Sequence, residues 1–244
     1  MTSASTNLLS LHAVHTRIGR YHILHGVDLE VPAGGVSVLL GRNGAGKTTT
    51  LRTIMGLWRA VHGRVLLGGD DVTRWPTPRI ARAGIGYVPE DMGIFGSLKV
   101  GENLRLAARG GEPDTARLDW IFGFFPALKT FWATPAGALS GGQKQMLAIA
   151  RALVEPRRLL LIDEPTKGLA PAVIDHLADA FVELKRHAIT ILLVEQNFEF
   201  ARTLGDSVHI LDDGRVVHRG SMAELAADEA LQRAHLGLAL GAHQ

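Results

Sequence analysis

The chain has 244 residues, of which 46% are hydrophobic and 20% are charged, and its formal net charge is +2. This size and composition are typical of one large globular α/β domain, and the near-balance of charge gives no sign of a basic nucleic-acid-binding surface. No cysteine is present, which excludes disulfide bonds, zinc–thiolate sites and thiol catalysis.

Apolar segments of the chain are too short to cross a membrane. The longest, at residues 159–162 and 189–194, have the length of strands and fall well below the ~18 residues of a membrane span. The first ten residues lack the basic region that opens a signal peptide. The sequence therefore predicts a chain that does not span a membrane, although it can bind to the surface of one.

The first third of the chain is predicted to be rich in strands. The expected strands cover residues 8–14, 27–31, 36–40, 64–67 and 84–88. Residues 36–40 form a short apolar run with a glycine on each side, which favours a buried parallel strand. A helix is expected from Gly46 onward, with Leu51, Ile54 and Met55 on its buried face because they follow i, i+3, i+4 spacing.

The rest of the chain is predicted to be helical at first and then to alternate strands with helices. Helices are expected at 99–108, 114–125, 140–153, 171–186 and 197–204, and strands at 159–162, 190–194, 208–211 and 216–218. Asp212-Asp213-Gly214 is expected to close a hairpin. The pattern predicts a single domain over residues 1–244, with a core at about 1–90 and 154–244 and a helical subdomain at about 91–153.

A glycine-rich loop joins the predicted buried strand to the helix that follows it. The segment GRNGAGKT matches the phosphate-binding pattern G-x-x-x-x-G-K-[ST] in full. Glycines let consecutive backbone N–H groups surround phosphate oxygens, Lys47 adds a positive charge, and Thr48 offers a hydroxyl to Mg²⁺. The alternative is a plain glycine-rich turn. The predicted nucleotide-binding residues here are Gly41, Arg42, Asn43, Gly44, Ala45, Gly46, Lys47, Thr48 and Thr49.

Two carboxylates follow the apolar strand at residues 159–162. At the carboxyl end of a parallel strand, Asp163 and Glu164 would share one sheet edge with the phosphate loop. Asp163 could hold Mg²⁺, and Glu164 could polarise an attacking water as a general base. Taken alone, an apolar strand followed by two acidic residues is common at protein surfaces and indicates no particular function. Together with the phosphate loop it predicts a nucleotide triphosphatase.

A second glycine-rich helix start lies at the segment LSGGQ. Ser140 can cap the helix, while Gly141 and Gly142 expose backbone N–H groups where an anion could bind. Ser140 and Gln143 also form the pattern of a capping box, and both interpretations can hold at once.

These residues closely resemble the signature motif of ABC ATPases, and the resemblance extends over nearly the whole chain. The segments PEDMGIFG, DEPTKGLAP and ILLVEQN are most similar to ATPase subunits of branched-chain amino-acid uptake systems. The resemblance implies an α/β fold: a P-loop NTPase core with a mainly parallel sheet, an N-terminal antiparallel β subdomain and a helical insertion.

The resemblance also implies an activity and partners. The chain would hydrolyse ATP to ADP and phosphate with Mg²⁺ and power the import of a small solute. Two ATPase subunits, identical or related, would pack head to tail, so that Ser140, Gly141 and Gly142 of one contact the γ-phosphate of ATP held by the other. Integral membrane permease subunits, and indirectly a solute-binding protein, would complete a transporter at the cytoplasmic face of the inner membrane. No nucleic-acid partner is expected.

Several positions depart from the pattern of the wider family. Glu90 stands where a glutamine usually reaches Mg²⁺, and Gln196 replaces the histidine that contacts the γ-phosphate. Ala170 replaces the aspartate of the loop that contacts the second subunit. Ile18 occupies the place of the aromatic residue that stacks on adenine, and Tyr21 lies close enough to substitute for it. The alternative for Tyr21 is a surface tyrosine.

Other interpretations remain open. The solute could be different, such as urea or an amide, or the chain could be an ABC ATPase acting on ribosomes or DNA, or a regulatory module without hydrolysis; the intact Glu164 argues against the last. A cluster of aromatic residues is expected either to form the core of the helical subdomain or to line a groove for a permease helix. It consists of Trp120, Phe122, Phe124, Phe125, Phe131 and Trp132.

Overall fold

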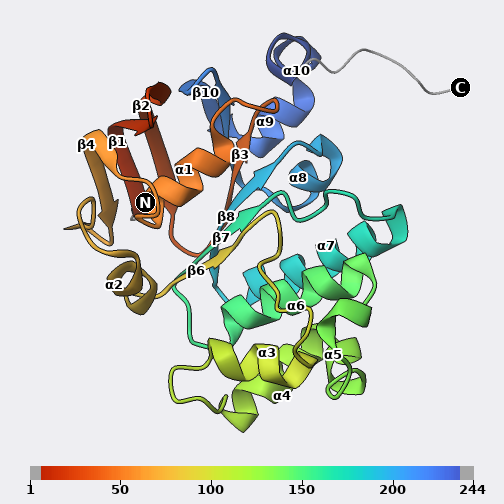
Figure 1. The fold of residues 1–244 in the computed structure, drawn as a ribbon. Coiled ribbons are helices and arrows are strands. Elements are labelled where there is room, and N and C mark those ends of the chain that lie inside the picture. Colours follow the sequence, from red (N-terminus) through yellow and green to blue (C-terminus); the bar gives the residue numbers. More distant parts are fainter. Residues whose placement is uncertain (1–6, 237–244) are drawn as a thin grey trace, which may run out of the picture.

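A computed structural model describes residues 7–236 of the chain as strands and helices arranged around two sheets (Figure 1). The strands are β1 (Asn7–Ile18), β2 (Tyr21–Pro32), β3 (Val36–Leu40), β4 (Ala60–Leu67), β5 (Asp70–Asp71), β6 (Ile85–Val88), β7 (Leu159–Asp163), β8 (Thr190–Glu195), β9 (Ser207–Asp212) and β10 (Arg215–Ser221). The α-helices are α1 (Lys47–Ile54), α2 (Thr77–Arg82), α3 (Val100–Ala107), α4 (Thr115–Phe124), α5 (Pro126–Thr130), α6 (Gly141–Leu153), α7 (Pro171–Arg186), α8 (Phe198–Leu204), α9 (Met222–Ala227) and α10 (Glu229–Leu236).

The larger sheet has six strands in the order β10-β9-β3-β8-β7-β6. All neighbours pair in parallel except β9 and β10, which form the predicted hairpin at Asp213 and Gly214, both with positive φ. A parallel sheet must be covered on both faces, and β3, β7 and β8 are accordingly buried along their whole length. The sheet predicted from the sequence is therefore confirmed.

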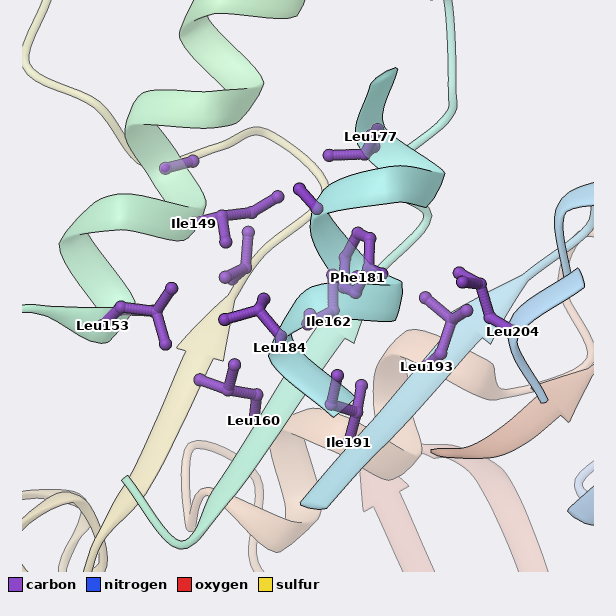
Figure 2. Close-up of a cluster of buried hydrophobic side chains, with 14 of the residues drawn as sticks. Ile149, Leu153, Leu160, Ile162, Leu177, Phe181, Leu184, Ile191, Leu193 and Leu204 are labelled. Atoms are coloured by element: carbon purple, nitrogen blue, oxygen red, sulfur yellow. The ribbon is translucent and has the colours of Figure 1, made fainter. Parts of the chain in front are cut away.

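Alternate residues of these strands serve two separate hydrophobic cores. Ile162 and Leu193 face the core formed with α6, α7 and α8, whereas Leu161 and Leu192 face the core shared with α1 and the antiparallel sheet. Figure 2 shows the first core, with Phe181 of α7 over the strands. The period-2 alternation of strand side chains thus lets one buried sheet stabilise layers on both of its faces.

The smaller sheet is antiparallel and has the order β2-β1-β4-β5. Its first two strands run much further than the predicted 8–14 and 27–31. A bulge at Ala13, which has φ +45°, breaks the alternation of apolar and polar residues, so the sequence pattern stops there although β1 continues to Ile18. This sheet packs beside α1, whose Leu51, Ile54 and Met55 are buried as predicted.

Between β6 and β7 the chain is helical, as predicted, from α3 to α6. The aromatic cluster of this segment packs against the α6–α7 core: Phe125 is almost fully buried, and the other five rings are half-buried against the same cluster. The interpretation as subdomain core is the one this packing supports. The subdomain boundaries near residues 91 and 153 stay a prediction.

Short helices were the main elements missing from the sequence prediction. α2 and α5 each have a proline within the first two helical residues, and proline in the sequence favours a turn. α9 and α10 occupy the last part of the described chain. None of the helices found between residues 7 and 236 has the length and apolar composition needed to cross a bilayer.

The buried ring of Phe125 offers a test of the aromatic core. We expect Phe125→Ala to lower the free energy of unfolding by about 3–5 kcal/mol, because the substitution leaves a cavity beneath α4 and α5. Phe124→Ala, which truncates a half-buried ring, should cost about 1–2 kcal/mol. Urea unfolding of both variants measures the difference, and equal costs would contradict the packing described.

Candidate active site

The loop between β3 and α1 depends on glycines at its two ends. Gly46, the N-cap of α1, has φ +107°, and a Cβ there would lie 2.9 Å from a methyl carbon of Leu24. At Gly41 a Cβ would lie 2.4 Å from the carbonyl oxygen of Leu211. A side chain at Gly44, with φ +84°, would meet no atom within 4 Å, so its requirement is the backbone conformation alone.

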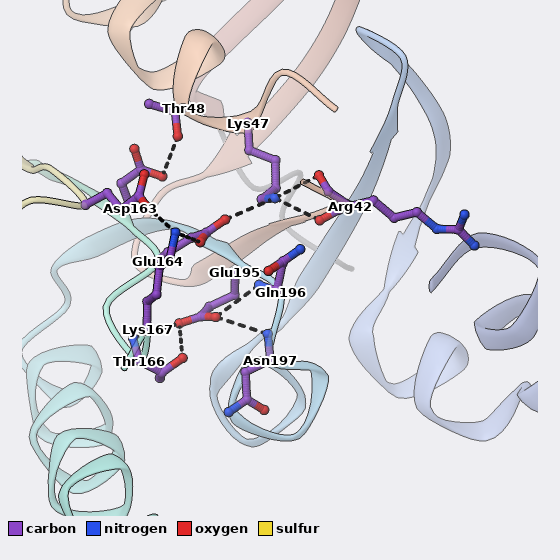
Figure 3. A network of polar contacts seen from close by, with 12 residues as sticks. Arg42, Lys47, Thr48, Asp163, Glu164, Thr166, Lys167, Glu195, Gln196 and Asn197 are labelled. Atoms are coloured by element: carbon purple, nitrogen blue, oxygen red, sulfur yellow. Dashed lines mark hydrogen bonds and ion pairs between the residues drawn. The ribbon is translucent and has the colours of Figure 1, made fainter. Parts of the chain in front are cut away.

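Lys47 begins α1 and turns back beneath the loop (Figure 3). Its ammonium donates hydrogen bonds to the carbonyl oxygens of Gly41 (2.8 Å) and Arg42 (3.1 Å) and lies 3.1 Å from a carboxylate oxygen of Glu164. Both charged side chains of this ion pair are nearly buried, at 4% and 8% exposure. The predicted phosphate-binding lysine and the predicted general base are therefore direct partners.

Asp163 ends β7 and is fully buried. The hydroxyl of Thr48 donates to its Oδ1 at 3.1 Å, while its Oδ2 has no hydrogen-bonding partner. Burial raises the pKa of Asp163 to about 6, with further raising by Glu164 and Glu90 and an opposing effect of the Thr48 hydrogen bond. A buried carboxylate with an unpartnered oxygen is poised to accept a cation.

Glu164 adopts a backbone conformation that is rare for a residue with a side chain. Its φ is +45°, and its backbone N–H donates to the carbonyl oxygen of Val194 at 2.9 Å. Such strained positions persist where surrounding structure fixes them and are common at functional sites. The turn aims the carboxylate at Lys47 rather than into the sheet.

A cavity of about 330 Å³ opens over these residues. It is lined by Ile23, Asn43, Gly44, Gly46, Lys47, Thr48, Thr49, Glu90, Glu164 and Lys167. The structure therefore brings most of the predicted phosphate loop, the general base and Glu90 to one place. Gly41, Arg42 and Ala45 form the loop without lining the cavity.

Lys167 and Glu90 form an ion pair across the mouth of this cavity. Lys167 lies in the turn after β7, and Glu90 lies in the segment after β6. The Lys167 ammonium is also 3.9 Å from Glu164. Lys167 was not selected from the sequence, because one lysine in a polar turn carries no signal by itself.

Glu195, at the end of β8, is a second residue that the sequence analysis missed. Its buried carboxylate accepts hydrogen bonds from the backbone N–H groups of Thr166, Gln196 and Asn197 and from the Thr166 hydroxyl at 2.8 Å. Burial raises the pKa of Glu195 above its usual value, although these hydrogen bonds act in the opposite direction. This network fixes the turn after β7 to the end of β8 (Figure 3). The available signal was an acidic residue at the end of a buried strand.

The predicted second anion site lies at the start of α6. Ser140 and Gln143 form the capping box in both directions, with the Gln143 N–H donating to the Ser140 hydroxyl and the Ser140 N–H donating to the Gln143 side chain. A Cβ on Gly142 would lie 2.4 Å from Val173 of α7, so only glycine fits there. Neither these residues nor Gly141 line the cavity at the phosphate loop.

Three remaining candidates lie at the periphery. Tyr21 is 61% exposed, accepts a hydrogen bond from Arg20, and does not line the cavity, which favours the surface-tyrosine alternative; Ile23 lines it instead. Gln196 is exposed next to Glu195, and its backbone N–H donates to that carboxylate. Ala170 is the N-cap of α7 and makes no side-chain cap.

The side chains at this site that could bind a metal suit Mg²⁺, which binds to few protein ligands, better than a metal whose ligands all come from the protein. Thr48, Asp163 and Glu90 offer only oxygen ligands, as Mg²⁺ prefers. Within residues 7–236, no three His, Asp or Glu side chains form a ready metal cage. Mg²⁺ usually keeps waters and bridges one or two carboxylates to phosphates, which fits this arrangement.

Comparisons with known proteins agree with this geometry. The ABC transporter family model matches residues 24–167. The high-affinity branched-chain amino acid transport ATP-binding protein BraG of Pseudomonas aeruginosa is 38% identical over 232 residues, which are 94% of this chain and all of BraG. A probable branched-chain amino acid transport ATP-binding protein, LivF of Archaeoglobus fulgidus, is 37% identical and covers 89% of this chain and 93% of its own. A solved ATP-binding subunit of an ABC transporter, 31% identical, superimposes with a TM-score of 0.79 over 94% of this chain and 96% of that one.

The raised pKa of Asp163 gives a testable pH dependence. The ordinary pKa of an aspartate is 3.8, so Asp163 loses its proton at a lower pH in the unfolded chain than in the folded one. Its contribution to the free energy of unfolding therefore falls as the pH rises from about 4 to about 6. We expect Asp163→Asn to raise the free energy of unfolding of the nucleotide-free protein by about 3 kcal/mol above this window. The gain should shrink toward zero below it. Chemical unfolding in EDTA across this pH range measures the effect, and a gain independent of pH would contradict it.

Proposed function

The chain belongs to the family of ABC transporter ATP-binding subunits, which hydrolyse ATP, and we propose that it powers the import of branched-chain or related amino acids through separate membrane subunits. One observation carries the catalytic part of the proposal. Lys47 and Glu164 form a buried ion pair at the cavity of the phosphate loop, and Thr48 links that loop to Asp163.

The residues divide the chemistry between them. Lys47 and the loop N–H groups would hold the phosphates, in place of the present contacts of Lys47 with Glu164 and two carbonyl oxygens. Thr48, Asp163 and Glu90 would hold Mg²⁺, which supplies charge neutralisation to the phosphates. Glu164, released by Lys47, would orient the attacking water and take its proton. Gln196 would donate a hydrogen bond to the γ-phosphate.

The position of α6 supports a site shared between two subunits. Ser140, Gly141 and Gly142 lie at the start of α6 and outside the cavity of their own chain. A second ATPase subunit packed head to tail would place the start of its α6 over the phosphate loop of the first subunit. The start of α6 of the first subunit would in turn lie over the phosphate loop of the second. ATP would then hold the two subunits together, and hydrolysis would release them.

A groove beside the cavity is suited to a membrane partner. It has a volume of about 370 Å³, and its lining includes Tyr87 in β6, Pro89, Met92 and Gly93 after β6, and Ala148 and Arg151 of α6. None of the six aromatic residues at 120–132 lines it. We therefore assign the permease contact to this groove rather than to the aromatic cluster, with the subunit lying peripherally at the cytoplasmic face of the membrane.

The assignment of the solute rests on the relatives. BraG and LivF, each covered almost throughout its length, are named for branched-chain amino acid transport. The segments PEDMGIFG, DEPTKGLAP and ILLVEQN are the features by which the sequence itself resembles that group. Urea or amide uptake is the alternative for a chain of this kind.

Glu164→Gln tests the enzymatic claim. In the assembled transporter, we expect kcat for ATP hydrolysis to fall by about 100-fold or more, because an amide cannot accept the proton of the attacking water. ATP binding should persist, since Lys47 and the loop are intact. Glu183→Gln, at an exposed ion pair with Arg186 on α7, is a matched control and should retain wild-type activity. Equal near-zero rates in wild type and Glu164→Gln would contradict hydrolysis.

Uptake measurements test the transport claim. We expect the chain to co-purify with integral membrane subunits encoded with it, and the reconstituted complex to import labelled leucine in an ATP-dependent manner. Unlabelled isoleucine and valine should compete, whereas urea should not. Uptake of urea but not leucine would change the assigned solute from amino acids to urea. Failure to recover any membrane subunit would contradict the transporter assignment.

A further inference from the structure

Charges of alternating sign form a row across the nucleotide cavity. The row runs from Lys47 to Glu164 (3.1 Å), from Glu164 to Lys167 (3.9 Å) and from Lys167 to Glu90. Lys47 and Glu164 have roles in the proposed function, and so has Glu90. Lys167 has none, although it lines the same cavity and contacts two of its carboxylates.

The backbone that carries Lys167 is held by hydrogen bonds, while its side chain is largely exposed. Its N–H donates to the carbonyl oxygen of Glu164 at 3.2 Å, and the preceding Thr166 is bound by the Glu195 carboxylate through both its N–H and its hydroxyl. The Lys167 side chain is nevertheless 58% exposed. The long lysine side chain on this fixed turn lets the ammonium contact Glu90 and also lets it separate from Glu90.

The carboxylates of this site need a cation when no metal is bound. Asp163, Glu164 and Glu90 converge on the phosphate loop, and their like charges disfavour one another. Lys47 neutralises Glu164 from the inside. The cation that neutralises Glu90, at the outer side of the cavity, is Lys167.

We propose that Lys167 is a positioning residue that stands in for Mg²⁺: it holds the Glu90 carboxylate at the nucleotide site until the metal arrives with the phosphates. This rests on the proposed function, in which Glu90 is a ligand of Mg²⁺. An ion pair this exposed is weak, so a divalent cation with phosphate oxygens displaces the ammonium from Glu90. The released Lys167 stays beside Glu164, from which the phosphates have drawn Lys47 away.

Competition between Lys167 and Mg²⁺ for Glu90 has a thermodynamic consequence that a purely structural ion pair lacks. Because Lys167 and Mg²⁺ compete for Glu90, removing the ammonium must strengthen the effect of Mg²⁺ on nucleotide binding. Without metal, the same change must weaken nucleotide binding, because a positive charge near the phosphates is lost. The two effects have opposite signs, and both require Lys167 to act at the site.

The test is calorimetric binding of the non-hydrolysable analogue AMP-PNP to the purified full-length subunit, in Mg²⁺ and in EDTA. The quantity compared is the metal ratio, Kd in EDTA divided by Kd in Mg²⁺. We expect Lys167→Met to raise this ratio about threefold to fivefold, the range that an exposed ion pair allows. Lys167→Arg should restore the wild-type ratio. In a Glu90→Gln background, Lys167→Met should change the ratio far less.

Lys129→Met is the matched control, because Lys129 forms an exposed ion pair with Asp119 on α4 and α5, away from the cavity residues. It should leave the metal ratio unchanged, and thermal melts should show that each variant folds. An unchanged ratio in Lys167→Met, or an equal rise in the Glu90→Gln background, overturns the role of Lys167 while leaving the proposed function in place. Absence of AMP-PNP binding in wild type under both conditions overturns the proposed function and this inference with it.

Discussion

Parallel pairing of β3, β8 and β7 is the constraint on which the rest of the structure depends. In that register Leu40 lies opposite Glu195, and Asp163 lies opposite Val194, so the carboxyl ends of three strands meet at one edge of the sheet. The loop after each strand therefore opens onto the same space. The phosphate loop, the acidic pair and the segment at Gln196 come from distant parts of the sequence, and the sheet alone brings them together.

The site is preorganised by its own charges. Lys47 is nearly buried, which would be costly for an unpaired ammonium. It is, however, paired with Glu164 and donates hydrogen bonds to two carbonyl oxygens. Glu195 is buried as well, and four hydrogen bonds satisfy it. Asp163 is the exception, since one of its oxygens has no partner. The unsatisfied group thus lies where a cation is required, and the satisfied groups keep its surroundings fixed.

Patterns with a strict local requirement were predictable from the sequence. The phosphate loop, the capping box at Ser140 and the hairpin at Gly214 each need particular residues at fixed spacing, and the structure has all three. The buried strands were found because they are short apolar runs. Contacts made by long side chains across the fold were not predictable: the partners of Lys167 and Glu195 depend on the pairing of β6, β7 and β8. The extent of β1 was missed because its bulge at Ala13 interrupts the periodicity.

The close fit of Gly142 against Val173 has a mechanical meaning. Residues 163–173 form one continuous segment, which begins at Asp163 and Glu164, is held at Thr166 by hydrogen bonds to Glu195, and ends in α7, where Val173 packs on Gly142. Gly142 has no side chain of its own, so the side chain of Val173 packs directly on the backbone of α6 and leaves little free space between the two helices. A displacement of the turn at Glu164 would therefore alter the packing of Val173 on Gly142 at its other end. In the proposed two-subunit site, this packing would link the cavity of one subunit to the helix start that the same subunit offers to its partner.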